Sequence, residues 1–326
     1  MSANAADAAD GRPEAGLPRL RVLLAAPRGF CAGVDRAVRV VEEALKRDGA
    51  PVYVRHEIVH NRVVVNGLAA QGAVFVEELD EVPPGVPVVF SAHGVAKSVP
   101  LAAAARGLTA FDATCPLVSK VHREAERHEA MGHHILMIGH AGHPEVEGTM
   151  GQVRLGAMTL VQSLAEAEAV APPPGPLAFV TQTTLSVEDA AEIVAVLRRR
   201  FPGIEGPAKE DICYATTNRQ AAVRAVAAEA GLVLVVGSAN SSNTMRLCEV
   251  ASRAGARAQL LEGPEALDLD VLEGETVIGI TAGASAPESL VQGLLARLGE
   301  HYALDVQERR VTTEDLTFKL PVALSA

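Results

Sequence analysis

The sequence has no tryptophan, and only three tyrosines and seven phenylalanines among its 326 residues. Aromatic stacking on bases or sugars is therefore not expected to dominate recognition. Lysine and arginine number 29 against 40 aspartates and glutamates, which gives a formal net charge of −11. Such a chain lacks the phosphate-neutralising charge of a non-specific nucleic-acid binder and the basic face of a membrane-surface protein. We expect neither nucleic acid nor membrane as a partner.

Long apolar runs and a disulfide framework are also missing. Wholly apolar segments such as residues 232–236 fall far short of the roughly 20 residues that span a bilayer. Four cysteines are too few for a disulfide scaffold; they suit a reducing, cytoplasmic compartment and point to metal or redox chemistry. Residues 1–19 show no apolar periodicity and no targeting pattern, so we expect a disordered arm there.

The most informative feature is a threefold internal repeat. A cysteine opens a segment of helical period that ends at a glycine, at residues 31–49, 115–132 and 213–231. Each segment is followed by a strand, a polar loop, a short helix and two further strands. This alternation predicts parallel α/β modules over residues 20–110, 111–207 and 208–300, followed by a C-terminal tail over 301–326 without a repeat partner.

Polar residues gather where the predicted strands end. In open parallel sheets, ligands bind beyond the carboxyl ends of the strands, so three inward-facing modules would bring these tips to one central site. The tips carry His60, His93, His143, Thr183, Ser241, Ser242, Asn243 and Ser285. Each histidine alone is more often a local hydrogen-bonding residue, but the convergent set resembles an anion site built from neutral donors.

Cys31, Cys115 and Cys213 occupy the same strand-to-helix junction in each module. A helix N-terminus there would lower a thiol pKa and favour a metal-binding thiolate. A structural zinc site normally takes four ligands at short spacings, whereas three thiolates on an iron–sulfur cube would leave one iron open to a substrate. Three buried free thiols remain the alternative. Cys248 lies mid-helix and is expected to be a core residue.

Glu145, two residues after His143, is either a solvated carboxylate in the first turn of a helix or a proton donor beside an open iron. Thr183 or Thr184 would connect it to a substrate hydroxyl.

Several strings resemble the 4-hydroxy-3-methylbut-2-enyl diphosphate reductase family, in order over residues 21–295. They are PRGFCAGVDRAV, YVRHEIVHN, FSAHGV, FDATCPLVSKVH, GHAGHPEVEGTMGQ, TQTTLS, DICYATTNRQ, GSANSSN and TAGASAP. The resemblance implies a trefoil of three α/β domains around one 4Fe–4S cluster per chain. It implies that Cys31, Cys115 and Cys213 are the cluster ligands, and that Glu145 and Thr183 are catalytic. The substrate diphosphate would be bound by His60, His93, His143, Ser241, Ser242, Asn243 and Ser285.

The implied reaction is a reductive dehydroxylation, the last step of the methylerythritol phosphate route, giving isopentenyl and dimethylallyl diphosphate. The resemblance also implies ferredoxin or flavodoxin as the electron donor. The glycines of PRGFCAGVD do not form a dinucleotide fingerprint. The main rival is a non-redox iron–sulfur dehydratase acting on a phosphorylated substrate. A redox or phosphate sensor and a mononuclear zinc hydrolase are further alternatives.

Overall fold

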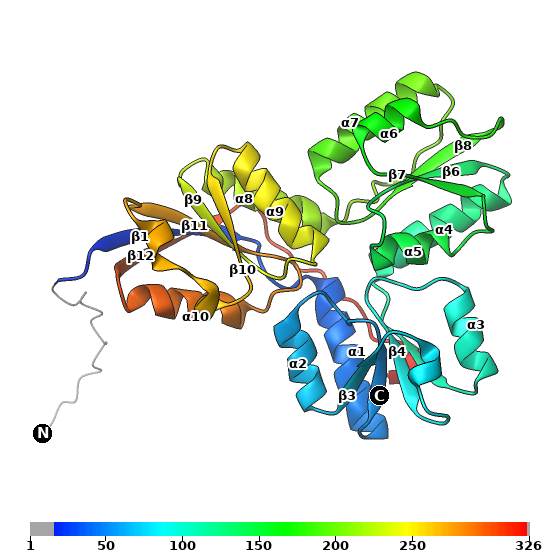
Figure 1. Ribbon diagram of the computed structural model, residues 1–326, viewed down its shortest axis with the longest axis horizontal. Helices are drawn as coiled ribbons and strands as arrows, with labels where there is room; N and C mark the ends of the chain where they lie inside the picture. The colour runs from blue at the N-terminus through cyan, green and yellow to red at the C-terminus, as the bar shows by residue number, and fades with distance from the viewer. Residues whose placement is uncertain (1–15, 325–326) are drawn as a thin grey trace, which may run out of the picture.

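The computed structural model describes residues 16–324. Three separate lobes, each built on its own sheet, surround a common centre (Figure 1). All strand pairs within the three sheets are parallel. The predicted fold class, α/β with three modules in a trefoil, is confirmed. Residues 1–15 of the predicted disordered arm lie outside the described residues, and the chain enters its first strand at Arg19.

The first lobe has a four-stranded sheet in the order β3-β2-β4-β5. Its strands are β2 (Val52–Arg55), β3 (Ala73–Val76), β4 (Pro87–Phe90) and β5 (Thr109–Asp112), and its helices are α1 (Ala32–Asp48), α2 (Arg62–Ala70) and α3 (Ser98–Ala105). One face of α1 is apolar at helical spacing, and Ala37, Val40, Val41 and Ala44 are fully buried against this sheet. Gly49 ends the helix with φ of 76°, a conformation that favours glycine.

The second lobe has a three-stranded sheet in the order β7-β6-β8. Its strands are β6 (His134–Ile138), β7 (Met158–Val161) and β8 (Leu177–Thr181), and its helices are α4 (Pro116–Ala130), α5 (Pro144–Met150), α6 (Leu164–Ala169) and α7 (Val187–Arg200). Strand β8 is buried along its whole length because α-helices cover both faces of the sheet.

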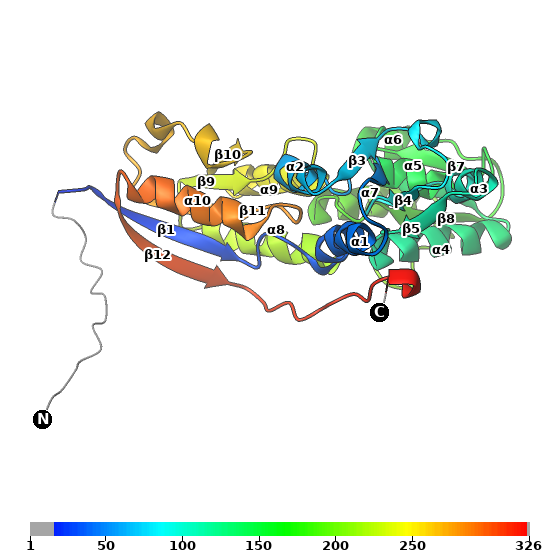
Figure 2. The same cartoon turned by 90° about the horizontal axis from the view of Figure 1, so that it is seen from below.

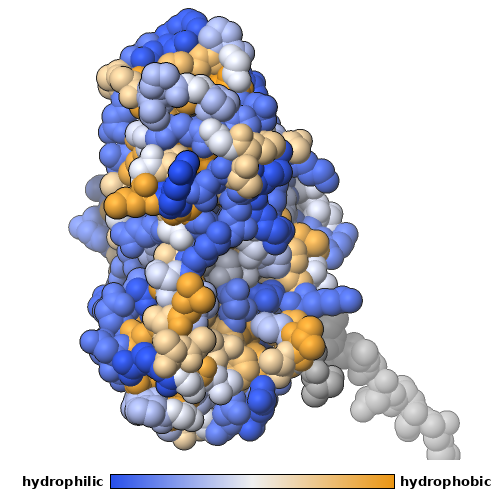
Figure 3. Space-filling model, turned by 90° about the vertical axis from the view of Figure 1, so that its right-hand side faces the viewer, coloured by the Kyte–Doolittle hydropathy of each residue, from blue (hydrophilic) through white to orange (hydrophobic). Residues whose placement is uncertain are grey.

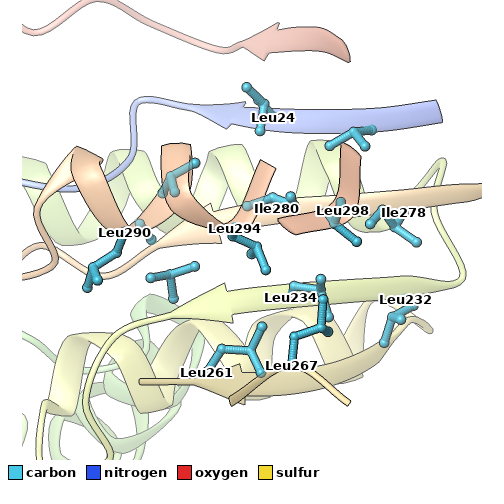
Figure 4. Close-up of a cluster of buried hydrophobic side chains, with 14 of the residues drawn as sticks. Leu24, Leu232, Leu234, Leu261, Leu267, Ile278, Ile280, Leu290, Leu294 and Leu298 are labelled. Carbon is cyan, nitrogen blue, oxygen red and sulfur yellow. The ribbon is translucent and has the colours of Figure 1, made fainter. Parts of the chain in front are cut away.

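The third lobe has a five-stranded sheet in the order β10-β9-β11-β1-β12. Its strands are β1 (Arg19–Ala26), β9 (Leu232–Val236), β10 (Arg257–Leu261), β11 (Val277–Ala282) and β12 (Ala303–Arg310), and its helices are α8 (Tyr214–Ala227), α9 (Ser242–Arg253) and α10 (Glu288–Gly299). Figure 4 shows Leu234, Ile280 and Leu294 in the core between this sheet and α10. Burying such side chains removes apolar surface from water, the main stabilising contribution to the lobe.

Two segments depart from the predicted modules. Strand β1, expected in the unit 20–110, pairs instead with β11 and β12 of the third lobe. Strand β12 completes that sheet, although residues 301–326 were expected to be a tail without a repeat partner. The alternation of strands and helices identifies strands but not their neighbours. Because strand β1 is almost wholly buried, it needs a neighbouring strand on each side. Strand β12, which has exposed residues, serves as the edge strand of the sheet.

The end of the molecule formed by the first and second lobes is covered mainly by hydrophilic residues, with scattered patches of hydrophobic ones (Figure 3). Among the described residues, no helix combines the length and apolar character that a bilayer crossing requires.

Candidate functional site

One cavity at the meeting point of the three lobes is lined by every residue that the sequence singled out for binding or catalysis. These are Cys31, His60, His93, Cys115, His143, Glu145, Thr183, Cys213, Ser241, Ser242, Asn243 and Ser285. Except for Cys213, each residue lies in a loop that follows a strand or in the first turn of the next helix. Cys213 was expected at a strand-to-helix junction, but the loop that holds it follows helix α7. The parallel sheets therefore place their polar tips together, as expected at the carboxyl ends of strands.

The three thiols occupy equivalent positions. Cys31, Cys115 and Cys213 are the N-cap residues of α1, α4 and α8, one from each lobe. A Cβ atom built on Gly33 would lie 2.7 Å from the Cys115 sulfur and 3.7 Å from the Cys31 sulfur, so the absence of a side chain at Gly33 leaves the space between these two sulfurs open. Three sulfurs facing one cavity are a suitable donor set for a soft metal centre.

The protonation state of these thiols differs from the sequence-based expectation. Burial, followed by the neighbouring Cys31, raises the pKa of the Cys115 thiol to about 12. Burial likewise raises the pKa of the Cys213 thiol to about 11, despite hydrogen bonds from the backbone and hydroxyl of Thr216. Desolvation thus outweighs the helix N-terminus, which was expected to lower these pKa values. Thiolates at these positions need a bound cationic centre, and the donor set therefore fits a metal cofactor.

Three imidazoles form a second group on the wall of the cavity. The rings of His60 and His93 stack with their centroids 4.1 Å apart, and His143 meets both edge-on at 5.6 and 5.8 Å. Burial, followed by the neighbouring imidazoles, lowers the pKa of His93 well below its ordinary value and that of His143 to about 4. The Nε2 atom of His60 is buried without a hydrogen-bond partner. Such a group is satisfied when a polar ligand enters.

Hydroxyl and amide groups complete this wall from the third lobe. Ser241 is the N-cap of α9, so backbone N–H groups of that helix start at the cavity. The Asn243 side chain accepts a hydrogen bond from the N–H of Ala284, and the Ser285 hydroxyl donates to the carbonyl of His60. These bonds hold neutral donors around a space suited to an anion.

Glu145 lies in the first turn of α5, two residues after His143, and is 2% exposed. Its Oε1 accepts a hydrogen bond from the Thr183 N–H at 2.6 Å, and its Oε2 accepts one from the Thr183 hydroxyl at 3.0 Å. Burial raises the pKa of Glu145 to about 7, although both hydrogen bonds oppose this change. The carboxyl is therefore buried, not solvated, and close to half protonated at neutral pH.

The comparisons with known proteins agree with this site. The model of the family described as LytB protein matches residues 22–299. The chain belongs to this family. The 4-hydroxy-3-methylbut-2-enyl diphosphate reductase of Gluconobacter oxydans is 66% identical over 312 residues, which cover 94% of this chain and 93% of the relative. The enzyme of the same name from Phenylobacterium zucineum is 63% identical and covers 94% and 98%.

Solved structures of the LytB fold agree as well. The E-1-hydroxy-2-methyl-but-2-enyl-4-diphosphate reductase from Plasmodium falciparum superposes with a TM-score of 0.89 at 37% identity, covering 94% of this chain and 97% of that one. A structure of (E)-4-hydroxy-3-methyl-but-2-enyl diphosphate reductase, described as the terminal enzyme of the non-mevalonate pathway, gives a TM-score of 0.63 at 31% identity. It covers 86% of this chain and 99% of that one.

In this LytB chain the structure adds neighbours that the sequence reasoning missed. Thr216 supplies both hydrogen bonds to Cys213, and its position three residues after an N-cap was the available signal. Glu57 lies 3.1 Å from Nδ1 of His60 and accepts a hydrogen bond from Asn240 of the third lobe. Its position three residues before His60 in a loop gave only a weak local signal.

A second cluster with metal-ligand chemistry lies outside this cavity. His128, His133 and Glu205 each place a ligand atom within 4.8 Å of the others. Arg127 can only donate to Nε2 of His128, at 3.2 Å, so Nδ1 of His128 carries the proton that faces Nδ1 of His133 at 3.4 Å. The cluster is therefore accounted for as a hydrogen-bonded chain from Arg127 through His128 to His133, whose Nε2 lies 3.6 Å from the Glu205 carboxylate.

Proposed function

We propose that the protein removes the allylic hydroxyl of (E)-4-hydroxy-3-methylbut-2-enyl diphosphate by reduction and yields isopentenyl and dimethylallyl diphosphate. The observation that carries this proposal is the shared cavity, in which three thiols, three imidazoles and one buried carboxyl face the same space. The names of close relatives supply the substrate, and the chemistry of the cavity is compatible with it. The reaction completes isoprenoid precursor synthesis by the non-mevalonate route.

Cys31, Cys115 and Cys213 would hold a 4Fe–4S cluster, one per chain. With three protein ligands for four irons, a bound cluster would supply electrons and one open Lewis-acidic iron for the substrate. The chain contributes burial, which excludes water from the thiols, and the open space beside Gly33. We propose ferredoxin or flavodoxin as the electron donor.

The diphosphate would bind among the imidazoles and the third-lobe donors, which are His60, His93, His143, Ser241, Ser242, Asn243 and Ser285. Because the pKa values of His93 and His143 are lowered, these rings are neutral before substrate arrives. The negative charge of a diphosphate favours their protonated forms, so binding would take up protons. Neutral donors avoid the desolvation penalty of a permanently charged buried pocket.

Glu145 would hold the proton that the leaving hydroxyl requires. Thr183 orients both carboxyl oxygens from one residue, and its hydroxyl lies on the same cavity wall, where it can also contact the substrate hydroxyl. A pKa near 7 makes the carboxyl an effective acid at neutral pH. Proton transfer to the departing oxygen releases water, and two electrons and a second proton complete the reduced product.

The decisive experiment is anaerobic reconstitution with iron and sulfide, followed by an assay of the hydroxylated diphosphate with and without a strong reductant. We expect both products, and only when reductant is present. A non-redox dehydratase would consume the substrate without reductant. Iron content near four per chain would also separate this reading from a zinc hydrolase. Absence of product in a cluster-loaded protein would refute the proposal.

A further inference from the structure

The chain crosses the back of the site near its C-terminus. Residues 311–324, which we call the C-terminal strap, leave β12 in the third lobe and run along the underside of the molecule to the first lobe (Figure 2). The strap begins with a backbone hydrogen bond from Val311 to Ala26. It ends with Leu324, which is buried in the core of the first lobe, where Leu320 also packs. Its two ends are thus fixed to different lobes.

In its middle, the strap neutralises a buried arginine. The Arg219 guanidinium is fully buried, and Glu314 of the strap accepts its hydrogen bonds at 3.1 and 3.3 Å. The same guanidinium donates to the carbonyls of Gly29 and Phe30, just before Cys31, at 2.8 to 3.2 Å. It also donates to the carbonyl of Ala215, two residues after Cys213, at 3.0 Å. Arg219 and Ala215 both lie on α8, whose N-cap is Cys213. Arg219 therefore joins the Cys213 helix to the loop before Cys31.

A second buried arginine makes the remaining connection. Arg36, on α1 five residues after Cys31, donates to the carbonyls of Asp112 and Thr114 at 3.3 and 3.0 Å, just before Cys115. Its third bond, from Nε, goes to the carbonyl of Lys319 in the strap at 2.8 Å. Each arginine thus joins the Cys31 unit to one of the other two thiol-bearing loops. Each of the two arginines also has one hydrogen-bond partner in the strap.

We infer that the C-terminal strap is a positioning device for the three thiols, acting through Arg219 and Arg36. A buried guanidinium stays in place only when it is fully hydrogen-bonded and its charge is compensated, and the Glu314 carboxylate provides the compensation. Without it, Arg219 would be drawn toward water and would release the carbonyls of Gly29 and Phe30 before Cys31 and that of Ala215 in the first turn after Cys213. That these thiols bind a cluster is the proposed function, on which this part of the inference rests; the linkage of the loops does not depend on it.

The test compares Glu314→Gln with Asp315→Asn, a neighbouring exposed carboxylate that undergoes the same loss of charge. The full chain, with iron removed under anaerobic conditions, is treated with iodoacetamide, and alkylation of each cysteine is followed by peptide mass spectrometry. Cys248 on α9 serves as the internal reporter of general loosening, because the hydrogen bonds described for the two arginines do not reach its helix. A parallel sample loaded with the cluster is challenged with an iron chelator.

We expect Glu314→Gln to increase alkylation of Cys31 and Cys213 at least tenfold, with Cys248 unchanged and Asp315→Asn like the parent. Iron release should accelerate by a similar factor. Arg36→Lys keeps the positive charge but loses the planar guanidinium that donates several hydrogen bonds at once. It should increase the alkylation of Cys115 instead. An equal increase at all four cysteines would reveal a purely structural role and overturn the inference, as would unchanged rates. Failure of the parent chain to take up iron would refute the proposed function alone, because alkylation requires no cluster.

Discussion

Replacing Glu145 by glutamine should make the protein more stable above neutral pH while removing most of its activity. The amide has nearly the same shape, and its oxygen can still accept the hydrogen bond from the Thr183 N–H. What it lacks is the ability to ionise or to donate a carboxyl proton. Glu145→Gln therefore measures the free-energy cost of keeping an ionisable carboxyl buried in the cavity.

The structure sets the size of this effect. The pKa of Glu145 is raised by burial from an ordinary 4.5 to about 7. A carboxyl whose pKa is higher in the folded chain than in the unfolded chain stabilises the fold at pH values below its unfolded pKa. This stabilisation is lost as the pH rises through the folded pKa. The difference amounts to about 3 kcal/mol, at roughly 1.4 kcal/mol per pH unit between 4.5 and 7. Glu145→Gln should not show this loss of stability. Its free energy of unfolding should therefore exceed that of the parent by an amount that grows across this pH interval and then levels off.

The assay is urea unfolding of the cofactor-free chain at pH 5 and pH 8.5, with Glu147→Gln as the control. Glu147 is an exposed carboxylate on the same helix α5, so its substitution should leave the pH dependence unchanged. Turnover of the loaded Glu145→Gln protein should fall by about 10² to 10⁴, the usual contribution of a positioned acid. If the free energy of unfolding changed equally with pH in the parent and in Glu145→Gln, Glu145 would not be a buried acid with a raised pKa.

Three further outcomes are expected. Cys31→Ser should lose most bound iron because one of three thiolates is missing, and full iron content by elemental analysis would contradict its role as a ligand. His60→Ala should raise KM at least tenfold with a smaller change in kcat, since its unpartnered Nε2 faces the proposed diphosphate site; an unchanged KM would place His60 outside it. Gly33→Ala should reduce cluster uptake, because its Cβ would lie 2.7 Å from the Cys115 sulfur. Gly67→Ala, which meets nothing within 4 Å, should take up iron like the parent, and equal uptake by both variants would refute the steric argument.

Much of the fold could be read from the sequence because its signals are local. Helix α1 ends at Gly49 with φ of 76°, and Gly132, with φ of 80°, follows the C-cap of α4. Helix α8 instead ends at Ala227, four residues before the predicted Gly231. The apolar runs became parallel strands. The pairing of β1 with β11 and β12 could not be read, since nothing in residues 19–26 specifies a neighbour more than 250 residues away. Long-range pairing is decided by which apolar faces the rest of the chain leaves uncovered.

In the candidate site, too, local features could be predicted from the sequence and long-range contacts could not. Residues at strand ends, such as His93 and Ser285, were identified because topology alone brings such ends together. The roles of Arg219 and Glu314 were not, because their ion pair joins segments 95 residues apart with no shared motif. Local sequence also gave the wrong sign for the pKa of Cys115, since the depth of burial depends on all three lobes.

The position of β1 in the third-lobe sheet has a consequence for biosynthesis. Arg21 pairs with Val277, so this strand leaves the ribosome long before its partners exist. At roughly 5–20 residues per second, the delay is on the order of 10 to 50 seconds. Throughout that time an apolar segment with open edges is available to other nascent chains. Protein yield in cells should therefore depend on chaperones that shelter residues 19–26 until β11 and β12 have been synthesised.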